Sequence, residues 1–348
     1  MGLTSSVVSD TLRSYTGVVT EEMKRYLLPG GFGQADLKRY LYDLVADYPG
    51  RLGKMMRPSI CLATAQAFGA SLEAAVPAAV SIELLHNSLL IHDDIEDESD
   101  ERRGSPTLHT LHGLPLALNA GSALGLLSLY PLLNRRSRLS EAVSARILKE
   151  TIRVGQESAE GQALELGWCR DNRLDLVERD YLELVLKKTC WLATIHPLRT
   201  GALIAGTRVV LDRFVRFGFF LGAAFQIHDD VLNLIGDAQK YGKELAGDLW
   251  EGKRTLIVIE LMSRATPAER RELRRFFATP RTQKCQADVD HVLTLLHRYG
   301  AIEAARVKSE ALAGAAQHEF DCTFASAPAS VHKEFLRELP TWVFERSS

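Results

Sequence analysis

The apolar positions of this chain recur with the period of an α-helix over most of its length. Apolar residues return every three or four positions, and the strict alternation that marks a half-buried strand is nearly absent. Glycine and proline gather at the expected breaks, such as Gly104-Ser105-Pro106. We therefore predict long helices over residues 77–97, 141–166, 175–205, 211–235 and 302–320.

Two of these helix starts carry local signals. Pro77 suits the first position of helix 77–97, where no N–H is needed, so we expect Ser71 and Glu73 in a short turn before it. Ser140 is the expected N-cap of helix 141–166, and Glu141 then places a negative charge in the first turn, which suits the helix dipole.

Long helices with polar positions among the apolar ones are typical of a bundle that surrounds a central cavity. The 348 residues contain no low-complexity linker and no obvious internal repeat. We predict an all-α fold, with residues 1–348 forming a single domain, one large helical bundle around such a cavity.

Composition excludes several classes of protein. The net charge of −2 argues against nucleic acid as a partner. No apolar run reaches the ~18 residues needed to span a bilayer, so we expect no transmembrane segment. The cysteines are odd in number and far apart, which argues against a disulfide framework or a zinc site. We expect reduced, buried thiols in a cytoplasmic protein; these are Cys61, Cys169, Cys190, Cys285 and Cys322.

An acidic cluster ends helix 77–97. On a helix, Asp93 and Asp97 lie one turn apart on one face, and Asp94 flanks them. Carboxylates this close repel one another, and a divalent cation removes that penalty. Hard oxygen ligands suit Mg²⁺, which shares its coordination with waters and phosphate oxygens. The alternative is a solvated helix end, but the residues leading into the cluster are strongly apolar.

A second cluster ends another apolar segment. Asp229 and Asn233 are also one turn apart, with Asp230 beside the first. Two helices that deliver carboxylates to one cavity would hold Mg²⁺ around an anion. Basic residues accompany both clusters, and they suit phosphate groups, although each taken singly is typical of a soluble surface. They are Lys54, Arg57, Arg102, Arg103, Lys187, Lys188, Lys243 and Lys253.

In this order the motifs resemble the trans-isoprenyl diphosphate synthase (polyprenyl synthetase) family, in particular its geranylgeranyl diphosphate synthases. The resemblance covers about residues 52–255 and implies the isoprenoid synthase type I fold. It is carried by Gly53-Lys54-x-x-Arg57-Pro58, Glu83-x-x-His86, His92-Asp93-Asp94-x-x-Asp97, Arg102-Arg103-Gly104, Gly161-Gln162, Lys188-Thr189, Phe225-Gln226-x-x-Asp229-Asp230, Tyr241-Gly242-Lys243 and Gly252-Lys253-x-Thr255.

The resemblance implies a role for each matching residue. Asp93, Asp97 and Asp229 bind Mg²⁺, with three ions in all, and Asp94 supports them. The allylic diphosphate is held by Arg102, Lys188 and Lys253. Isopentenyl diphosphate, the second substrate, is held by Lys54, Arg57, His86 and Arg103. Three residues assist around the reacting centre: Thr189, Gln226 and Lys243. The resemblance also implies a homodimer.

Three positions depart from the family pattern. Asn233 stands where the second cluster usually ends in Asp, which keeps an oxygen but loses a charge and puts the third metal site in doubt. Glu165 replaces an Asp and is one methylene longer. Ser122 stands where an Asp is common.

The resemblance implies a Mg²⁺-assisted condensation. The allylic C–O bond breaks, the isopentenyl double bond attacks the carbocation, and a proton leaves. Short-chain members of the family often place bulky aromatics just before the first cluster. Ser88 and Leu89 leave more room there, which favours a geranylgeranyl product over farnesyl or a longer polyprenyl chain.

Two other functions stay open at this point. A class I terpene cyclase shares the first cluster, but it has no use for a second diphosphate pocket built from Lys54, Arg57, His86 and Arg103. A non-catalytic partner subunit of another synthase is the second alternative. The intact Asp93, Asp94, Asp97 and Asp229 argue against it, whereas Glu165 and Asn233 keep it open.

Overall fold

The computed structural model describes residues 4–27, 35–51, 53–134, 139–236 and 245–345. Helices form nearly all of the regular structure in these ranges, and one hairpin of two-residue strands is the only β-structure there. The all-α prediction is therefore confirmed.

The chain folds into two compact units, each assembled from separate stretches of sequence. Unit 1 comprises Met1–Val154, Leu192–Val215 and Phe320–Leu339, and unit 2 comprises Gly155–Trp191, Arg216–Glu319 and Pro340–Ser348. The single domain expected over residues 1–348 stays a prediction.

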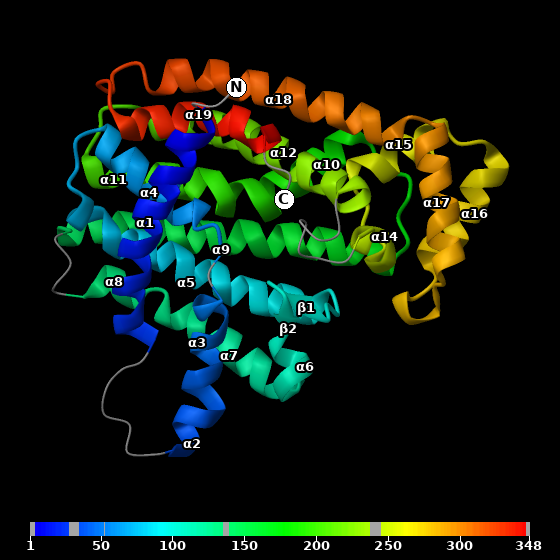
Figure 1. Cartoon of the computed structure of the whole chain (residues 1–348), viewed down its shortest axis with the longest axis horizontal. Coiled ribbons are helices and arrows are strands. Elements are labelled where there is room, and N and C mark those ends of the chain that lie inside the picture. Colours follow the sequence, from blue (N-terminus) through cyan, green and yellow to red (C-terminus); the bar gives the residue numbers. More distant parts are fainter. Residues whose placement is uncertain (1–3, 28–34, 52, 135–138, 237–244, 346–348) are drawn as a thin grey trace. The chain divides into compact units, whose positions relative to one another are not determined.

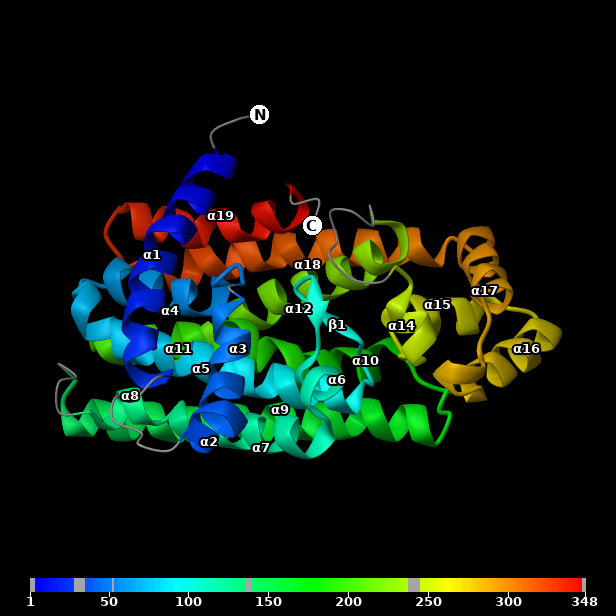
Figure 2. The same cartoon turned by 60° about the horizontal axis from the view of Figure 1, so that its bottom comes forward.

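Unit 1 holds the N-terminal helices and the hairpin. In Figures 1 and 2, α5 lies beside α4 and α7, and α1 packs across α4 and α5. The elements are α1 (Thr4–Leu27), α2 (Ala35–Leu37), the π-helical η1 (Lys38–Tyr42), α3 (Asp43–Gly50), α4 (Met56–Ala67), α5 (Leu72–Glu96), β1 (Glu101–Arg102), β2 (Ser105–Pro106), α6 (Leu108–His112), α7 (Leu114–Leu127), α8 (Tyr130–Leu133) and α11 (His196–Ala205).

Unit 2 holds the second acidic cluster, and in Figure 1 α17 lies beside α15. Its own elements are α10 (Glu178–Val185), α14 (Gly247–Glu251), α15 (Leu256–Arg264), α16 (Pro267–Ala278), the 3₁₀ turn η3 (Arg281–Gln283) and α17 (Gln286–Arg298). Five segments contribute residues to both units: α9 (Glu141–Arg170), the π-helical η2 (Leu186–Ile195), α12 (Leu211–Ile235), α18 (Ala301–Thr323) and α19 (Val331–Glu345).

The core of unit 1 depends on close packing of helices. A Cβ on Gly201 of α11 would lie 2.5 Å from the carbonyl oxygen of Cys61 in α4, so only glycine permits this approach. Aromatic rings close one end of the core, with ring centroids of Phe320 and Phe324 4.8 Å apart and Phe68 stacked on Phe324 at 5.3 Å. Helices α4 and α11 both contact α5, which carries the first acidic cluster.

Two predicted helix starts are wrong, and local capping explains both. Helix α5 begins at Leu72, because the Ser71 Oγ accepts the Ala74 N–H at 3.3 Å, so Pro77 lies inside the helix. Helix 175–205 starts later, at Glu178, where the Asp180 carboxylate accepts the Val177 N–H at 2.9 Å.

Other predicted boundaries are confirmed. The Val143 N–H donates to Ser140 Oγ at 3.3 Å, so Ser140 caps α9 as expected, although that helix continues to Arg170. Helix α12 spans Leu211–Ile235, the predicted range. The helix predicted over 302–320 corresponds to the slightly longer α18, Ala301–Thr323.

One expectation from composition needs correction, and the expected absence of a transmembrane segment is not confirmed. Cys285 and Cys322 are exposed, so not all thiols are buried. Among the described residues, Leu72–Glu96 and Leu114–Leu133 are long and apolar enough, by length and composition, to cross a membrane. The first is 78% buried and is a core helix, whereas the second is only 39% buried.

Candidate functional site

The first acidic cluster lies where α5 ends. Asp97 caps the helix, and its N–H donates to the carbonyl of Asp93 at 2.8 Å, which places the two residues one turn apart as expected. The side chains of Asp93 and Asp97 are partly exposed, whereas Asp94 is 0% exposed. The carboxylates of Asp93 and Asp97 are therefore accessible to a ligand, whereas that of Asp94 contacts other protein groups.

Asp94 holds Arg102. The Arg102 Nε–H donates to Oδ1 and Oδ2 of Asp94 at 2.9 and 3.1 Å, Nη2 contacts the same carboxylate, and the Tyr48 hydroxyl donates to Oδ2. Burial lowers the pKa of Arg102, but Asp94 outweighs burial, and the pKa ends above its ordinary value. The Arg102 guanidinium therefore keeps its charge in a nearly dry position, 3.6 Å from the Asp93 carboxylate.

The β1–β2 hairpin presents Arg102 and Arg103. Arg102 pairs with Ser105 across the strands, so Arg103 and Gly104 form the two-residue turn. Both have positive φ, 55° and 70°, as such a turn requires. The left-handed conformation costs a non-glycine residue about 1 kcal/mol. Conformations of this kind gather at functional sites, which is where the family resemblance places Arg103.

Arg103 is packed against three neighbours. Its Nη1–H donates to the carbonyl of Tyr48 at 3.0 Å and to Oδ1 of Asn87 at 3.4 Å. A Cβ on Gly53 would lie 2.7 Å from Arg103 Nη2, so glycine at this position makes room for the guanidinium. The glycine of the Gly53-Lys54 motif thus serves Arg103 directly, which spacing alone does not reveal.

A buried carboxylate, Glu83, gathers the residues expected to bind isopentenyl diphosphate. Glu83 is 2% exposed and accepts the Asn87 Nδ2–H at 3.0 Å. Burial raises its pKa, but His86, Arg57 and Arg103 outweigh burial and the pKa is lowered. Burial and the charge of Arg57 lower the pKa of His86 to about 4. At neutral pH His86 is therefore uncharged, and its contact with Glu83 at 3.4 Å acts together with the charges of the two arginines to keep Glu83 ionised.

The remaining predicted residues of unit 1 lie nearby on α4, α5 and α7. Lys54 is exposed on the turn before α4. The Ser88 hydroxyl donates to the carbonyl of Gly121 at 2.8 Å, and a Cβ on Gly125 would lie 3.0 Å from Ser88 Oγ. Ser88 is therefore buried where α5 and α7 approach closely, and Leu89 next to it is partly buried. Their control of product length stays a prediction.

The second acidic cluster, on α12 in unit 2, repeats the division of the first. Asp229 is partly exposed, whereas Asp230 is buried and accepts the Tyr181 hydroxyl at 2.7 Å and the Gln226 Nε2–H at 2.8 Å. Burial, and then the charge of Asp248, raise the pKa of Asp230 well above its ordinary value. Each cluster thus pairs a partly exposed aspartate with a buried one that accepts from a tyrosine hydroxyl.

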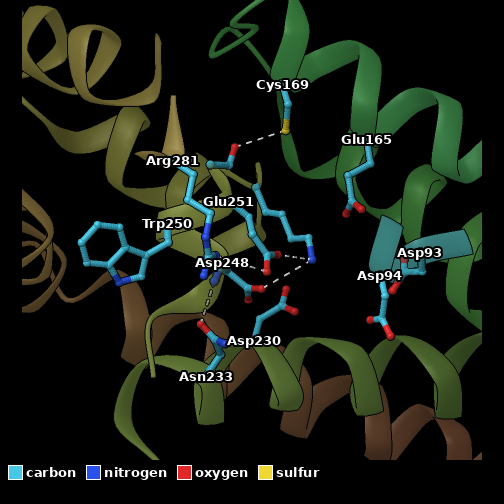
Figure 3. A network of polar contacts seen from close by, with 12 residues as sticks. Asp93, Asp94, Glu165, Cys169, Asp230, Asn233, Asp248, Trp250, Glu251 and Arg281 are labelled. Carbon is cyan, nitrogen blue, oxygen red and sulfur yellow. Dashed lines mark hydrogen bonds and ion pairs between the residues drawn. The ribbon is translucent and has the colours of Figure 1, made fainter. Parts of the chain in front are cut away.

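Asn233 is used inside unit 2. Its Oδ1 accepts the backbone N–H of Asp248 at 3.2 Å (Figure 3). Its carbonyl accepts the N–H of Ala246 at 2.8 Å. These bonds hold the start of α14. The amide oxygen expected as a neutral metal ligand therefore already has a backbone donor.

Lys188 and Thr189 lie on η2. The Lys188 ammonium pairs with Glu165, and the Thr189 hydroxyl donates to Oε1 of Gln226 at 2.9 Å. A Cβ on Gly161 would lie 2.3 Å from the backbone nitrogen of Lys188, so only glycine allows α9 and η2 to pack this closely. We expected an ordinary α-helix here. The wider π-helical turn, often found at functional sites, carries no signal in apolar periodicity.

Lys253 directly follows the turn that ends α14. Its Nζ lies 2.6 Å from Oε2 of Glu251 and 4.0 Å from Oδ1 of Asp248, in the network of Figure 3. Gly252 closes the helix with a φ of 75°. Lys243, expected to assist the reaction, lies outside the described residues.

Sequence reasoning missed three residues that contact the predicted ones. Asp248 carries a weak signal, since it is an acidic residue between two predicted positions, Asn233 and Lys253. Tyr48 and Tyr181 carry none, because their hydroxyls reach Asp94 and Asp230 across 46 and 49 residues of sequence. Such contacts exist only once the helices pack.

The donors present suit a hard divalent cation. Among the described residues, no group of three or more His, Cys, Asp or Glu side chains is arranged to hold a metal ion alone. In the two clusters the partly exposed aspartates are Asp93 and Asp97 in unit 1 and Asp229 in unit 2. Mg²⁺ needs only one or two carboxylates when waters and phosphate oxygens complete its shell, so each cluster by itself fits that ion.

Comparison with known proteins assigns the chain to a family. Residues 38–296 match the family model described as polyprenyl synthetase. The chain belongs to the polyprenyl synthetase family. A short chain isoprenyl diphosphate synthase of Methanothermobacter thermautotrophicus is 34% identical over 261 residues, which cover 73% of this chain and 75% of that protein. The geranylgeranyl pyrophosphate synthase of Geoglobus acetivorans is 30% identical over 340 residues, covering 98% and 99%.

A solved structure extends the likeness of this polyprenyl synthetase to the fold. The geranylgeranyl pyrophosphate synthase of Corynebacterium glutamicum, complexed with isoprenyl diphosphate and magnesium, superposes with a TM-score of 0.85 at 26% identity, covering 96% of this chain and 99% of that one. The isoprenoid synthase fold and the family resemblance are thereby confirmed. This polyprenyl synthetase is a divalent-metal-dependent trans-prenyltransferase that acts on isoprenyl diphosphates.

Proposed function

We propose that this polyprenyl synthetase condenses isopentenyl diphosphate with an allylic diphosphate, with Mg²⁺ as its metal, and releases geranylgeranyl diphosphate. The observation that most supports it is the Asp94–Arg102 pair, which fixes a charged guanidinium beside the partly exposed Asp93. A cation and an acidic metal ligand at one place suit a metal-bound diphosphate.

We assign binding of the allylic diphosphate to Arg102, Lys188 and Lys253. Each of these cations is paired with a carboxylate of its own unit, which stabilises its position. Asp93, Asp97 and Asp229 would hold Mg²⁺, with three ions as the expected number. The bound ions would neutralise charge on the leaving diphosphate. The allylic C–O bond breaks, and the diphosphate leaves with its electron pair.

Isopentenyl diphosphate occupies the second, metal-free position. We assign its diphosphate to Lys54, Arg57, His86 and Arg103, of which the last three lie around Glu83. Its double bond attacks the allylic carbocation and forms the new C–C bond. Loss of a proton then removes the positive charge from the lengthened chain. Thr189 and Gln226, joined by a hydrogen bond, and Lys243 assist around the reacting centre.

The geranylgeranyl product rests on two supports. A relative aligned over nearly the whole chain is named a geranylgeranyl pyrophosphate synthase. Ser88 and Leu89, just before the first cluster, are not aromatic, so they leave room for a longer chain. A bulky Ser88→Phe variant is therefore expected to stop elongation earlier and release a shorter alcohol.

A product assay tests the proposal. The purified protein is incubated with isopentenyl diphosphate, Mg²⁺ and dimethylallyl, geranyl or farnesyl diphosphate, and the dephosphorylated alcohols are sized by mass. We expect geranylgeraniol, lost with EDTA and in Asp93→Ala. Farnesol or a longer alcohol would change the proposed chain length of the product but leave the proposed reaction unchanged. A cyclic hydrocarbon formed without isopentenyl diphosphate would indicate a terpene cyclase, and no turnover with any primer would indicate a partner subunit.

We also propose that a second copy of this chain covers an apolar stripe on unit 1. The stripe is made of exposed apolar side chains of α6, α7 and α8, of which Leu126 is 75% exposed. Exposed apolar side chains gathered on consecutive helices indicate an interaction surface. It consists of Leu111, Leu114, Leu118, Leu126, Tyr130 and Leu133.

Light scattering after gel filtration tests the homodimer. We expect about twice the chain mass of 38.6 kDa, and a monomer for Leu126→Glu. Val331→Glu, an exposed apolar position on α19, is the matched control and is expected to remain a dimer. A wild-type monomer that binds lipid vesicles would assign the stripe to a membrane. The cytoplasmic location stays a prediction.

A further inference from the structure

Arg51 connects the end of α3 with both strands of the β1–β2 hairpin. Its Nη1–H groups donate to the carbonyl oxygens of Arg102 and Ser105 at 3.0 and 3.3 Å. Its Nη2–H donates to the carbonyl of Pro106 at 2.8 Å. One guanidinium therefore contacts backbone on either side of the Arg103–Gly104 turn, and the motifs that indicate the family do not include this residue.

The hairpin depends on such support. Its strands have two residues each, so they offer few hydrogen bonds of their own. The turn also contains Arg103 in the left-handed conformation, which adds a local cost. The position of the two arginines is therefore imposed by neighbouring elements.

Arg51 is itself held in a defined place. Its side chain is 11% exposed, and its Nε lies 2.6 Å from Oδ1 of Asp47 one turn earlier. The guanidinium carbon lies 4.7 Å from the centroid of the Tyr48 ring, the distance of a cation–π contact. Its Nη1 and Nη2 groups donate to backbone carbonyls and its Nε lies beside Asp47, so Arg51 is oriented toward the hairpin rather than toward a ligand.

Tyr48 supports the hairpin from the other side. Its hydroxyl donates to Asp94, which binds Arg102, and its carbonyl accepts the Arg103 Nη1–H at 3.0 Å. That carbonyl belongs to the C-terminal turn of α3, where the helix dipole favours a cation. Residues of one helical turn thus contact the backbone of the hairpin and the side chains of both its arginines.

We propose that Arg51 is a positioning residue, which sets the place of Arg102 and Arg103 for diphosphate binding without touching a diphosphate itself. The inference rests on the diphosphate-binding role proposed above for Arg102 and Arg103. It requires the planar fork of arginine, because three separate guanidinium nitrogens contact Asp47, the carbonyls of Arg102 and Ser105, and the carbonyl of Pro106, and the single nitrogen of a lysine cannot make all of these contacts at once.

The test compares Arg51→Lys with the wild-type enzyme. Lysine keeps the charge, the reach to Asp47 and the contact with Tyr48, but it loses the fork. We expect the KM values for both diphosphates, and the Kd for inorganic diphosphate measured by calorimetry, to rise by about tenfold, as for a ~1.4 kcal/mol loss. Arg264→Lys is the matched control, since Arg264 also joins a carboxylate and a backbone carbonyl, in unit 2, and we expect it to leave all three values unchanged.

Two results would overturn the inference. One is an Arg51→Lys enzyme with wild-type KM and Kd values. The other is a lower kcat with unchanged KM and Kd, which reports a smaller folded fraction and not a misplaced binding group. If Arg51→Lys does not fold, Asp47→Asn replaces it: this variant removes the carboxylate that holds the Arg51 Nε, so it must raise the same KM and Kd values. A wild-type protein that binds inorganic diphosphate but turns over no substrate defeats the proposed function alone, because the calorimetric comparison still decides the role of Arg51.

Discussion

The guanidinium of Arg102 lies on the buried carboxylate of Asp94, 2.9 Å away, and is 3.6 Å from the partly exposed carboxylate of Asp93. Neighbours in the sequence therefore have different roles. Successive helical positions differ by about 100° in direction, so Asp94 faces the hairpin, whereas Asp93 stays partly exposed, as the metal ligand proposed above must be.

Substitution to asparagine should separate these roles. Asp94→Asn leaves Arg102 as a buried charge without its counter-ion, and we expect a loss of about 3 kcal/mol in the free energy of unfolding. Asp93→Asn should change that free energy by less than about 0.5 kcal/mol, as for a partly exposed site, but raise the Mg²⁺ concentration needed for half-maximal activity. Urea unfolding and a Mg²⁺ titration of activity measure both, and equal stabilities for the two variants would contradict the assignment.

Asn233→Asp restores the charge that is usual in the family. The new carboxylate would lie beside Asp248 and buried Asp230, whose pKa is already raised by burial and by Asp248. We expect a lower Tm in EDTA and a larger rise in Tm on adding Mg²⁺ with inorganic diphosphate than in the wild type. The exposed Gln283→Glu, which adds the same charge, is the control. A wild-type response to Mg²⁺ would show that the position does not face the metal.

Glu251 occupies the ammonium of Lys253, which we propose binds the allylic diphosphate. Their side chains are 2.6 Å apart, and a diphosphate that binds Lys253 must replace this ion pair. Glu251→Gln weakens the pair, so we expect the KM of the allylic diphosphate to fall about threefold, equivalent to ~0.7 kcal/mol. Steady-state kinetics measure the change, with the exposed Glu272→Gln as a control of equal charge. A higher KM would mean that Glu251 positions Lys253 instead.

The buried His196 should make stability depend on pH. Burial, which outweighs the opposing charge of Glu150, lowers its pKa from 6.5 to about 4. Between pH 6.5 and 4 the unfolded chain therefore binds more protons here than the native one, and stability falls as the pH falls through this window. One such proton contributes up to about 1.4 kcal/mol per pH unit.

Urea unfolding at pH 6.5, 5.5 and 4.5 measures this slope. His196→Gln removes the titrating group, so we expect its stability to fall less steeply with decreasing pH than that of the wild type. His318→Gln, which makes the same exchange at an exposed position on α18, is the control. Parallel curves for His196→Gln and the wild type would contradict the prediction.

Much of the architecture could be predicted from local pattern. The range of α12 and the capping role of Ser140 follow from apolar period and capping chemistry, which act within one turn of helix. The start of α5 was misplaced because a favourable cap at Ser71 outweighs the cost of Pro77 inside the helix. The π-helical η2 escaped prediction since its apolar period differs little from that of an α-helix.

Residue type and short spacing are enough to predict the helical class, the two acidic clusters and the set of basic residues. Three other features arise only when the helices pack: which aspartate of each cluster is buried, the support that Arg51 gives the hairpin, and the room that Gly53 leaves for Arg103. These relations join residues dozens of positions apart. Their energies come from burial and from hydrogen bonds that form only when helices pack, and no local pattern records them.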